Sequence, residues 1–234
     1  IYTQLRIDSL FRFGRNEENT ATIDKELYIV ITAEGGFSGD IDQKLIRYML
    51  ESYDPNKQDI IVIGHHGAVQ LAQKGISFKK YFKLPEKDQN INVTPITKYV
   101  TDYKTAVVYY QQYVSLMVQD VKRIELSKAV ADQGKKTESS EEIISESNYI
   151  FEPSAYAVVG HLERSMMQIM IEQLILDSKL AQYASRFRAM SASHQMADEQ
   201  FSDVTLRFNR AKRAVKDERL KEIVNGLRKA AHAS

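Results

Sequence analysis

Cysteine and tryptophan are absent from the 234 residues, and only four prolines are present. Without cysteine there is no disulfide framework, no thiolate ligand for a metal and no cysteine nucleophile, and a cytosolic setting is expected. Basic and acidic side chains nearly cancel, 32 against 31, so the charge of the whole chain does not favour nucleic acid or an acidic lipid surface. No run of about 18 apolar residues is present, so the sequence predicts no membrane span and no signal peptide.

One long stretch, residues 154–234, also lacks proline, and it has no glycine between Gly160 and Gly226. Apolar side chains recur along it at alternating steps of three and four residues, interrupted by polar side chains at Gln173 and His194. The apolar seam includes Leu176, Leu180, Tyr183, Phe187, Met190, Phe201, Val204 and Phe208. Such a repeat is typical of one continuous helix that packs lengthwise against another. At about 1.5 Å per residue this helix would be roughly 100 Å long, so we expect a shaft that projects from the rest of the protein.

The first half of the chain contains the succession of strand, glycine turn and helix twice. Residues 27–32 and 59–64 are short apolar runs rich in β-branched side chains, as in the buried strands of a parallel sheet. The first run is followed by a helix that Asp40 can cap, and the second by a helix over 68–74 that ends at Gly75. The predicted core face of the first helix consists of Ile41, Leu45, Tyr48 and Met49. This order predicts an α/β fold with a Rossmann-like parallel sheet.

The segments that follow are less regular. Residues 91–96 fit either a strand or extended chain, although Pro95 argues against a central strand. We expect a helix over 97–103, a strand over 106–110 and an edge strand or hairpin over 114–126.

The chain therefore divides into four predicted parts. Residues 1–13 fit the last turns of a helix, residues 14–130 form the α/β body, residues 131–153 are a polar linker, and residues 154–234 are the long helix. Because the sequence begins with isoleucine, we expect that further residues precede it and complete the first helix.

The glycine-rich turn at 34–39 is a candidate ligand site, because glycines allow backbone N–H groups to approach a phosphate at a helix N-terminus. Its glycines match neither the P-loop nor the dinucleotide fingerprint, and Asp40 would repel a phosphate. We therefore expect a tight turn with positive φ and no bound nucleotide. Ser38 lacks the G-x-S-x-G context of a nucleophile elbow. His65 and His66 are adjacent, so their side chains diverge, and we expect a surface loop and no metal site there.

The end of the long helix is strongly basic. Between Arg207 and Lys229, nine basic residues stand against three acidic ones. Because the apolar seam runs into this segment and Phe208 is its one aromatic residue, the helix suits a protein socket with acidic walls better than nucleic acid. A solvated helix end, favoured by the helix macrodipole, is the alternative.

Six short stretches, in order along the chain, resemble the gamma subunit of F-type rotary ATPases, which forms the central stalk. Residues 32–39 are similar to the family's Ser-Thr-Asp-Arg-Gly-Leu-Cys-Gly turn, 63–67 to its Ile-Gly-x-Lys-Gly and 149–153 to its Tyr-x-x-Glu-Pro. Residues 184–190 resemble Ala-Ala-Arg-Met-x-Ala-Met, 208–214 resemble Tyr-Asn-Lys-Ala-Arg-Gln-Ala, and 220–226 resemble Leu-Thr-Glu-Ile-Val-Ser-Gly. The last two matches are the most specific.

The resemblance implies that the body is inserted between the two helices of a long antiparallel coiled coil. It implies a non-catalytic rotor that couples ATP hydrolysis or synthesis, in a hexameric ring of alpha and beta subunits, to rotation. The chain itself would hold no cofactor or metal and bind no nucleic acid. An epsilon-like subunit and a membrane ring would be its partners at the body end, on the cytoplasmic face of the cell membrane. The residues expected to contact the ring are Asn209, Arg210, Lys212, Arg213, Asp217, Arg219 and Glu222.

Several positions depart from the family's pattern. The departures are Arg213 for Gln, Asp217 for Thr, Arg219 and Gln182 for Glu, Gly35 for a basic residue and Ser38 for Cys. An F-type-like rotary ATPase whose output is not ATP synthesis would tolerate such changes, and it is the first alternative function. A small-ligand-binding α/β enzyme with a helical oligomerisation arm is the second alternative, and a nucleic-acid-binding coiled coil is the third.

Overall fold

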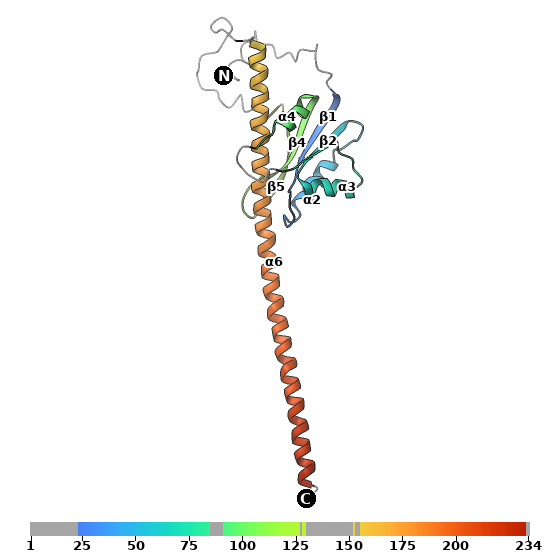
Figure 1. The fold of residues 1–234 in the computed structure, drawn as a ribbon, viewed down its shortest axis with the longest axis vertical. Coiled ribbons are helices and arrows are strands. Elements are labelled where there is room, and N and C mark those ends of the chain that lie inside the picture. The colour runs from blue at the N-terminus through green and yellow to red at the C-terminus, as the bar shows by residue number, and fades with distance from the viewer. Residues whose placement is uncertain (1–22, 85–90, 127, 130–151, 153–154, 233–234) are drawn as a thin grey trace. The chain divides into compact units, whose positions relative to one another are not determined.

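Residues 23–84, 91–126, 128–129, 152 and 155–232 are described by a computed structural model (Figure 1). The chain divides into two compact units, residues 1–187 and residues 188–234. The first unit contains a sheet, its helices and the first part of helix α6 (Ala155–His232), and the second contains the continuation of α6. The predicted long C-terminal helix is thus confirmed. The predicted helix end at 1–13 and all of the predicted linker except Glu152 lie outside the described residues.

The sheet of the first unit has five strands in the order β3-β2-β1-β4-β5. Its strands are β1 (Ile23–Ile31), β2 (Gln58–Ile63), β3 (Lys80–Phe82), β4 (Tyr103–Tyr113) and β5 (Gln119–Glu125). The first four run parallel, and β5 runs antiparallel to β4 at one edge. The predicted parallel sheet and the hairpin at its edge are confirmed. The sequence did not predict β3, because a strand of three residues carries no periodic signal.

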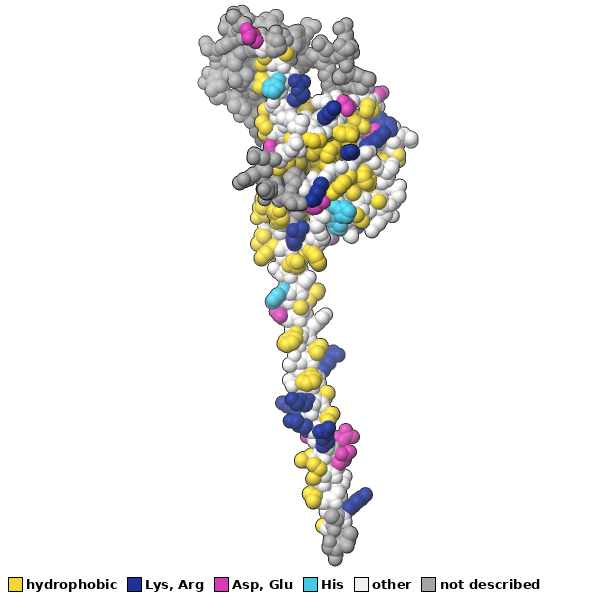
Figure 2. Space-filling view, viewed as in Figure 1, with side chains coloured by type: hydrophobic (Ala, Val, Ile, Leu, Met, Phe, Trp, Pro, Cys, Tyr) yellow, Lys and Arg dark blue, Asp and Glu magenta, His cyan; other side chains and the backbone are white. Residues whose placement is uncertain are grey.

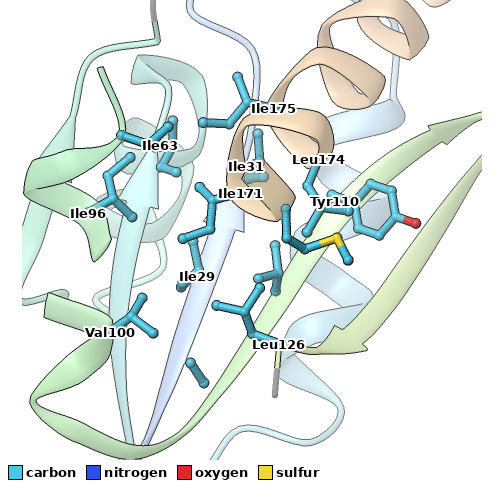
Figure 3. Close-up of a cluster of buried hydrophobic side chains, with 14 of the residues drawn as sticks. Ile29, Ile31, Ile63, Ile96, Val100, Tyr110, Leu126, Ile171, Leu174 and Ile175 are labelled. Atoms are coloured by element: carbon cyan, nitrogen blue, oxygen red, sulfur yellow. The ribbon is translucent and has the colours of Figure 1, made fainter. Parts of the chain in front are cut away.

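Helices cover both faces of the sheet. Successive side chains of a strand point to opposite faces, and Ile29 of β1 enters a core with α4 (Thr94–Thr101) and α6. Its neighbour Tyr28 enters the other core, with α2 (Ile41–Leu50) and α3 (His65–Gln73). Figure 3 shows Ile29 among side chains from α4 and α6. Burial on both faces explains why β1 and β2 are continuous apolar runs in the sequence.

One face of α6 packs against the sheet over residues 170–185. Its buried apolar side chains are Met170, Ile171, Leu174, Ile175, Ala181 and Ala184. The buried polar or charged side chains in the same stretch are Ser178, Lys179, Gln182 and Ser185. The seam residues Leu176, Leu180, Tyr183 and Phe187 lie on another face of the helix and are between 36% and 59% exposed. A helical partner for the seam stays a prediction.

Two local predictions were wrong at least in part. Residues 91–93 have no regular secondary structure, as the extended alternative allowed, but residues 94–96 are helical, because α4 begins at Thr94 with Pro95 in its first turn, where a missing backbone N–H removes no helical hydrogen bond. Tyr48 is 38% exposed and lies outside the core of α2, with its ring edge-on to that of Tyr109 at 5.9 Å between centroids.

The N-terminus of α2 differs from its prediction in one detail. Asp40 occupies the cap position as expected, but its side chain makes no capping hydrogen bond, and its carboxylate pairs with Lys44 at 2.9 Å. Among the described residues no helix, α6 included, carries an apolar stretch long enough to cross a lipid bilayer.

Candidate functional site

The carboxyl ends of β1 and β4 form the topological switch point of the sheet. The chain adds β2 and β3 on one side of β1 and then β4 on the other side. In doubly wound α/β proteins, ligands bind outside the carboxyl ends of the strands at such a point. The turn after β1, which carries the predicted ligand candidate, lies at this edge.

Glu34 anchors the turn to neighbouring elements. Its carboxylate accepts hydrogen bonds from the hydroxyl of Tyr81 (2.9 Å), from the backbone N–H of Leu84 (3.0 Å) and from the backbone N–H of His65 (3.2 Å). Burial raises the pKa of Tyr81 to about 12, and the hydrogen bond to Glu34 adds to the rise. Glu34 therefore occupies the position that a phosphate would have to approach, and its carboxylate is already bonded to donors of the protein.

A second carboxylate, that of Asp42, is fully buried in the first turn of α2. Its Oδ1 accepts hydrogen bonds from the backbone N–H of Ala33 (3.2 Å) and from Nε2 of Gln111 (2.7 Å). Its Oδ2 lies 2.7 Å from Nδ1 of His66. The positive end of the α2 dipole also favours a negative charge there. Three donors and the helix dipole together compensate the burial of this carboxylate.

The expectation of a surface loop at His66 is wrong. Helix α3 begins at His65, and the side chain of His66 is only 34% exposed because its ring turns toward Asp42. The hydrogen bond to Asp42 raises the pKa of His66, burial opposes the rise, and the charge of Asp42 reinforces it. On the other side of the ring, Nε2 lies 3.4 Å from Nε2 of Gln70. A neutral ring that donates from Nδ1 can accept from Gln70 at Nε2.

Hydrogen bonds continue from Asp42 through Gln111 to helix α6. Gln111 lies near the end of β4 and is fully buried. Its amide nitrogen donates to Asp42, and its amide oxygen accepts from Oγ of Ser178 and from Nε2 of Gln182 (3.0 Å). Nε2 of Gln182 also lies 3.1 Å from Oγ of Ser178. We call Asp42, Gln111, Ser178 and Gln182 the polar junction. Neither its members nor their connection was predicted from the sequence.

The geometry of the turn disfavours a bound phosphate or nucleotide. The expected positive φ is confirmed at Gly39 (67°) and also occurs at Phe37 (66°). Helix α6 contacts the turn, because Oγ of Ser185 donates a hydrogen bond to the backbone oxygen of Ser38 at 2.6 Å. Within the described ranges, no three His, Asp or Glu side chains are grouped as the ligands of a metal would be.

A groove of about 600 Å³ lies elsewhere in the first unit, against helices α2 and α3. Its lining includes the polar side chains of Gln43, Arg47, Gln73 and Lys74. None of the four residues of the polar junction lines it. Gln70 also lines the groove and lies 3.4 Å from the ring of His66, so the groove adjoins the side chains that contact Asp42 but does not include the junction itself.

The seven predicted ring-contact residues all lie in the second unit, and all are exposed. They occupy residues 209–222, about 20 Å of helix at about 1.5 Å per residue, so they lie along the helix rather than together at one point. The seam residues from Met190 to Phe208 are exposed as well. Nζ of Lys212 lies 6.0 Å from the centre of the Phe208 ring. Figure 2 shows Lys and Arg side chains at several levels of this part of the helix.

One exposed ion pair and one histidine contact lie along the same part of α6. Arg207 pairs with Asp203 at 2.8 Å, and Nδ1 of His194 lies 3.1 Å from Asp198. An exposed ion pair one helical turn apart, such as Arg207 with Asp203, contributes about 0.3–0.5 kcal/mol. His194, one of the polar positions in the predicted seam, has a side chain that is 80% exposed.

Sequence reasoning missed an apolar stripe near the C-terminal end. Its members follow i, i+3, i+4, i+7 spacing and are Leu220, Ile223, Val224 and Leu227, all between 40% and 67% exposed. The seam would continue from Val215 to the acidic residues Glu218 and Glu222, so the new stripe is displaced by one to two residues. Each residue turns the helix by about 100°. The apolar side chains near the C-terminal end of α6 therefore lie on a different face of the helix from the seam. A single partner that packs along the seam does not cover both stripes.

Known protein sequences match nearly the whole chain. A family model described as ATP synthase matches residues 5–229. The ATP synthase gamma chain of Macrococcus caseolyticus is 26% identical over 220 residues, which cover 87% of this chain and 73% of the relative. The ATP synthase gamma chain of Pelotomaculum thermopropionicum is 28% identical over 211 residues, which cover 86% of this chain and 72% of the relative.

Solved structures share the fold. A chain in the OSCP, F1 and c-ring of the Euglena gracilis mitochondrial ATP synthase, in rotational state 3, matches with a TM-score of 0.64 at 16% identity. The match covers 99% of this chain and 86% of that one. A chain in the central stalk and c-ring of the Tetrahymena thermophila mitochondrial ATP synthase matches with a TM-score of 0.55 at 18% identity, covering 76% and 80%. At these identities the likeness concerns the fold alone.

Proposed function

The chain belongs to the ATP synthase gamma-chain family, and from this membership we propose that it is the central-stalk rotor subunit of an F-type rotary ATPase. In this function it couples ATP hydrolysis or synthesis in a ring of alpha and beta subunits to rotation. The observation that carries the proposal is the family match over residues 5–229, which includes the α/β body and the long helix together.

The two units suit two tasks of a rotor. The second unit is a basic helix whose side chains are exposed from Met190 to Lys229, which suits a socket in the alpha and beta ring that has acidic walls. The α/β body suits the attachment of an epsilon-like subunit and a membrane ring; the assembly of the Euglena relative includes a c-ring. The chain is non-catalytic in this proposal, and the complex lies on the cytoplasmic face of the cell membrane with this chain as a peripheral subunit.

Co-expression of the tagged chain with the alpha and beta subunits of its own organism tests this function. We expect the three subunits to co-purify with ATPase activity, and a bead attached to the α/β body to rotate when ATP is added. A chain that purifies alone, while alpha and beta subunits are present and folded, would refute the rotor function.

Torque in this proposal is spread over the exposed residues from Asn209 to Glu222. Each exposed pair between a cation and a carboxylate is worth only about 0–1 kcal/mol. We therefore predict that Arg210→Ala and Lys212→Ala, made separately, leave rotation and most of the ATPase activity of the assembled complex intact. Single-molecule rotation and bulk ATPase assays measure this, and complete loss of rotation in either variant, with the complex still assembled, would contradict distributed contact.

A rotor whose output is not ATP synthesis is the second candidate. The observation that favours it is the set of departures from the family's pattern at Arg213, Asp217 and Arg219, in the segment proposed to contact the ring. Reconstitution of the complex in vesicles with its membrane ring separates the two functions, because a synthase makes ATP when a proton gradient is imposed.

The small-ligand enzyme is disfavoured by the carboxylates of Glu34 and Asp42 at the switch point. Its test is a thermal-shift titration of the chain with ATP and with inorganic phosphate. A rise in melting temperature with either ligand would favour the enzyme over the rotor.

A further inference from the structure

We propose that the polar junction fixes the rotational position of helix α6 on the α/β body, and that torque passes from the helix into the body through it. The inference rests on the proposed rotor function and names the contact that keeps the rotor rigid. All four junction residues, Asp42, Gln111, Ser178 and Gln182, belong to the first unit and are at most 3% exposed.

Apolar packing alone resists rotation of a helix weakly. Before the junction, α6 contacts the sheet through Met170, Ile171, Leu174 and Ile175. The hydrophobic effect that holds these side chains has no direction. Apolar cores also accept repacked side chains of similar volume at low cost, and methionine is especially adaptable. These contacts keep one face of α6 on the sheet, but because they can repack they leave small rotations about the helix axis at low cost.

Hydrogen bonds at the junction do select one rotation. The amide oxygen of Gln111 accepts from Ser178 and from Gln182, which lie one turn apart on the same face of α6. A hydrogen bond weakens steeply when its donor leaves a narrow range of distance and angle. A rotation too small to expose the apolar face would already move both donors out of hydrogen-bonding geometry with Gln111. Buried polar groups left without a partner destabilise that rotated position.

Asp42 fixes which end of the Gln111 amide faces the helix. A carboxylate only accepts hydrogen bonds, so Gln111 must point its amide nitrogen at Asp42, and its oxygen is thereby presented to α6. The reversed amide would place its oxygen against the carboxylate and its nitrogen against the donors of α6. Asp42 is thus a positioning residue that acts through Gln111.

The junction is also well anchored on the body side. Asp42 belongs to α2 and holds the backbone of Ala33 at the end of β1 and the ring of His66 in α3. Gln111 belongs to β4. A force applied to α6 at this level is therefore shared by two strands and two helices. One turn after Gln182, Ser185 adds a bond to the turn after β1 (2.6 Å).

The test uses the assembled complex with a bead on the α/β body. The chain has no cysteine, so one introduced at the exposed position Glu51 labels the body at a single site. Ser178→Ala combined with Gln182→Leu removes both bonds from α6 to Gln111 and leaves Asp42 paired. The matched control is Gln200→Leu, the same amide-to-alkyl change at an exposed position of the same helix that is not part of the apolar seam.

We expect the double variant to keep the ATPase turnover of the complex while the angular spread of the bead during catalytic pauses rises above that of Gln200→Leu. An angular spread equal to the control would overturn the proposal. A proportional fall in ATPase turnover and rotation, with the subunits still assembled, would overturn it too, because it would assign the junction a role in folding alone.

Gln182→Met provides a second route, since it keeps the bond from Ser178 to Gln111. We expect its angular spread to lie between those of the control and the double variant, and no rise above the control would overturn the proposal. Assembly of the wild-type complex distinguishes a failure of this proposal from a failure of the proposed rotor function. If alpha and beta subunits assemble without the wild-type chain, the rotor function fails before any junction variant is compared.

Discussion

Gly64, which precedes α3, is where the ends of β1 and β2 approach most closely. Its φ is +100°, a conformation that side chains with a Cβ rarely adopt. A Cβ at this position would lie 2.1 Å from the backbone oxygen of Thr32 and 2.7 Å from its carbonyl carbon. Backbone atoms of β1 cannot turn aside as a flexible side chain can. We expect Gly64→Ala to lose about 1–3 kcal/mol through backbone strain and about 1–3 kcal/mol more through overpacking.

Two other glycines separate these two causes. Gly75 has a φ of +70° and no atom within 4 Å of an added Cβ, so Gly75→Ala should cost only the strain of the left-handed region, about 1–2 kcal/mol. Gly36 also has open space and a φ outside that region, so Gly36→Ala should stabilise the fold by about 0.4–1 kcal/mol. Urea unfolding followed by tyrosine fluorescence suits a chain with 13 tyrosines and no tryptophan. If Gly64→Ala is no less stable than Gly75→Ala, the close approach to Thr32 is refuted.

Two further predictions concern titrating groups. The pKa of His66 is raised in the folded chain. Its pair with Asp42 therefore stabilises the fold fully at pH values below the pKa of the unfolded chain, about 6.5. This stabilisation is lost as the pH rises through the pKa of the folded chain. The urea midpoint of the wild type should therefore fall more than that of His66→Gln between about pH 6 and 8, and parallel curves would argue against the pair. The pKa of Tyr103 is raised to about 12 by burial and by its hydrogen bond to Asp59 (2.9 Å), and more weakly by Asp102. Ultraviolet titration should show a larger fall of this pKa in Asp59→Asn than in Asp102→Asn, and equal falls would contradict the assigned hydrogen bond.

The fold of the first unit could be predicted because its signals are local. A strand buried on both faces, such as 27–32, must be apolar throughout, and the turn after it needs residues that accept positive φ. The two failures have equally physical causes. Pro95 excludes a central strand but is well suited to the first turn of a helix, and Tyr48 has the spacing of a core residue but packs at the rim against Tyr109. Neither distinction can be drawn without knowing which elements are neighbours.

The polar junction lay beyond sequence reasoning because helix α6 carries two interleaved stripes. The stripe from Leu176 through Leu180 is the apolar one, so a search for hydrophobic periodicity finds it, yet these side chains are 36% and 48% exposed. After Ile175 the buried side chains of α6 are mostly polar, with the small side chains of Ala181 and Ala184 between them, and hydroxyl and amide groups in a sequence are typical of a solvated surface. Burying such groups is costly unless each one finds its partner in a single geometry. A polar stripe that is nonetheless buried therefore marks the level at which α6 has only one allowed rotation on the body, which is the property that a torque-bearing contact requires.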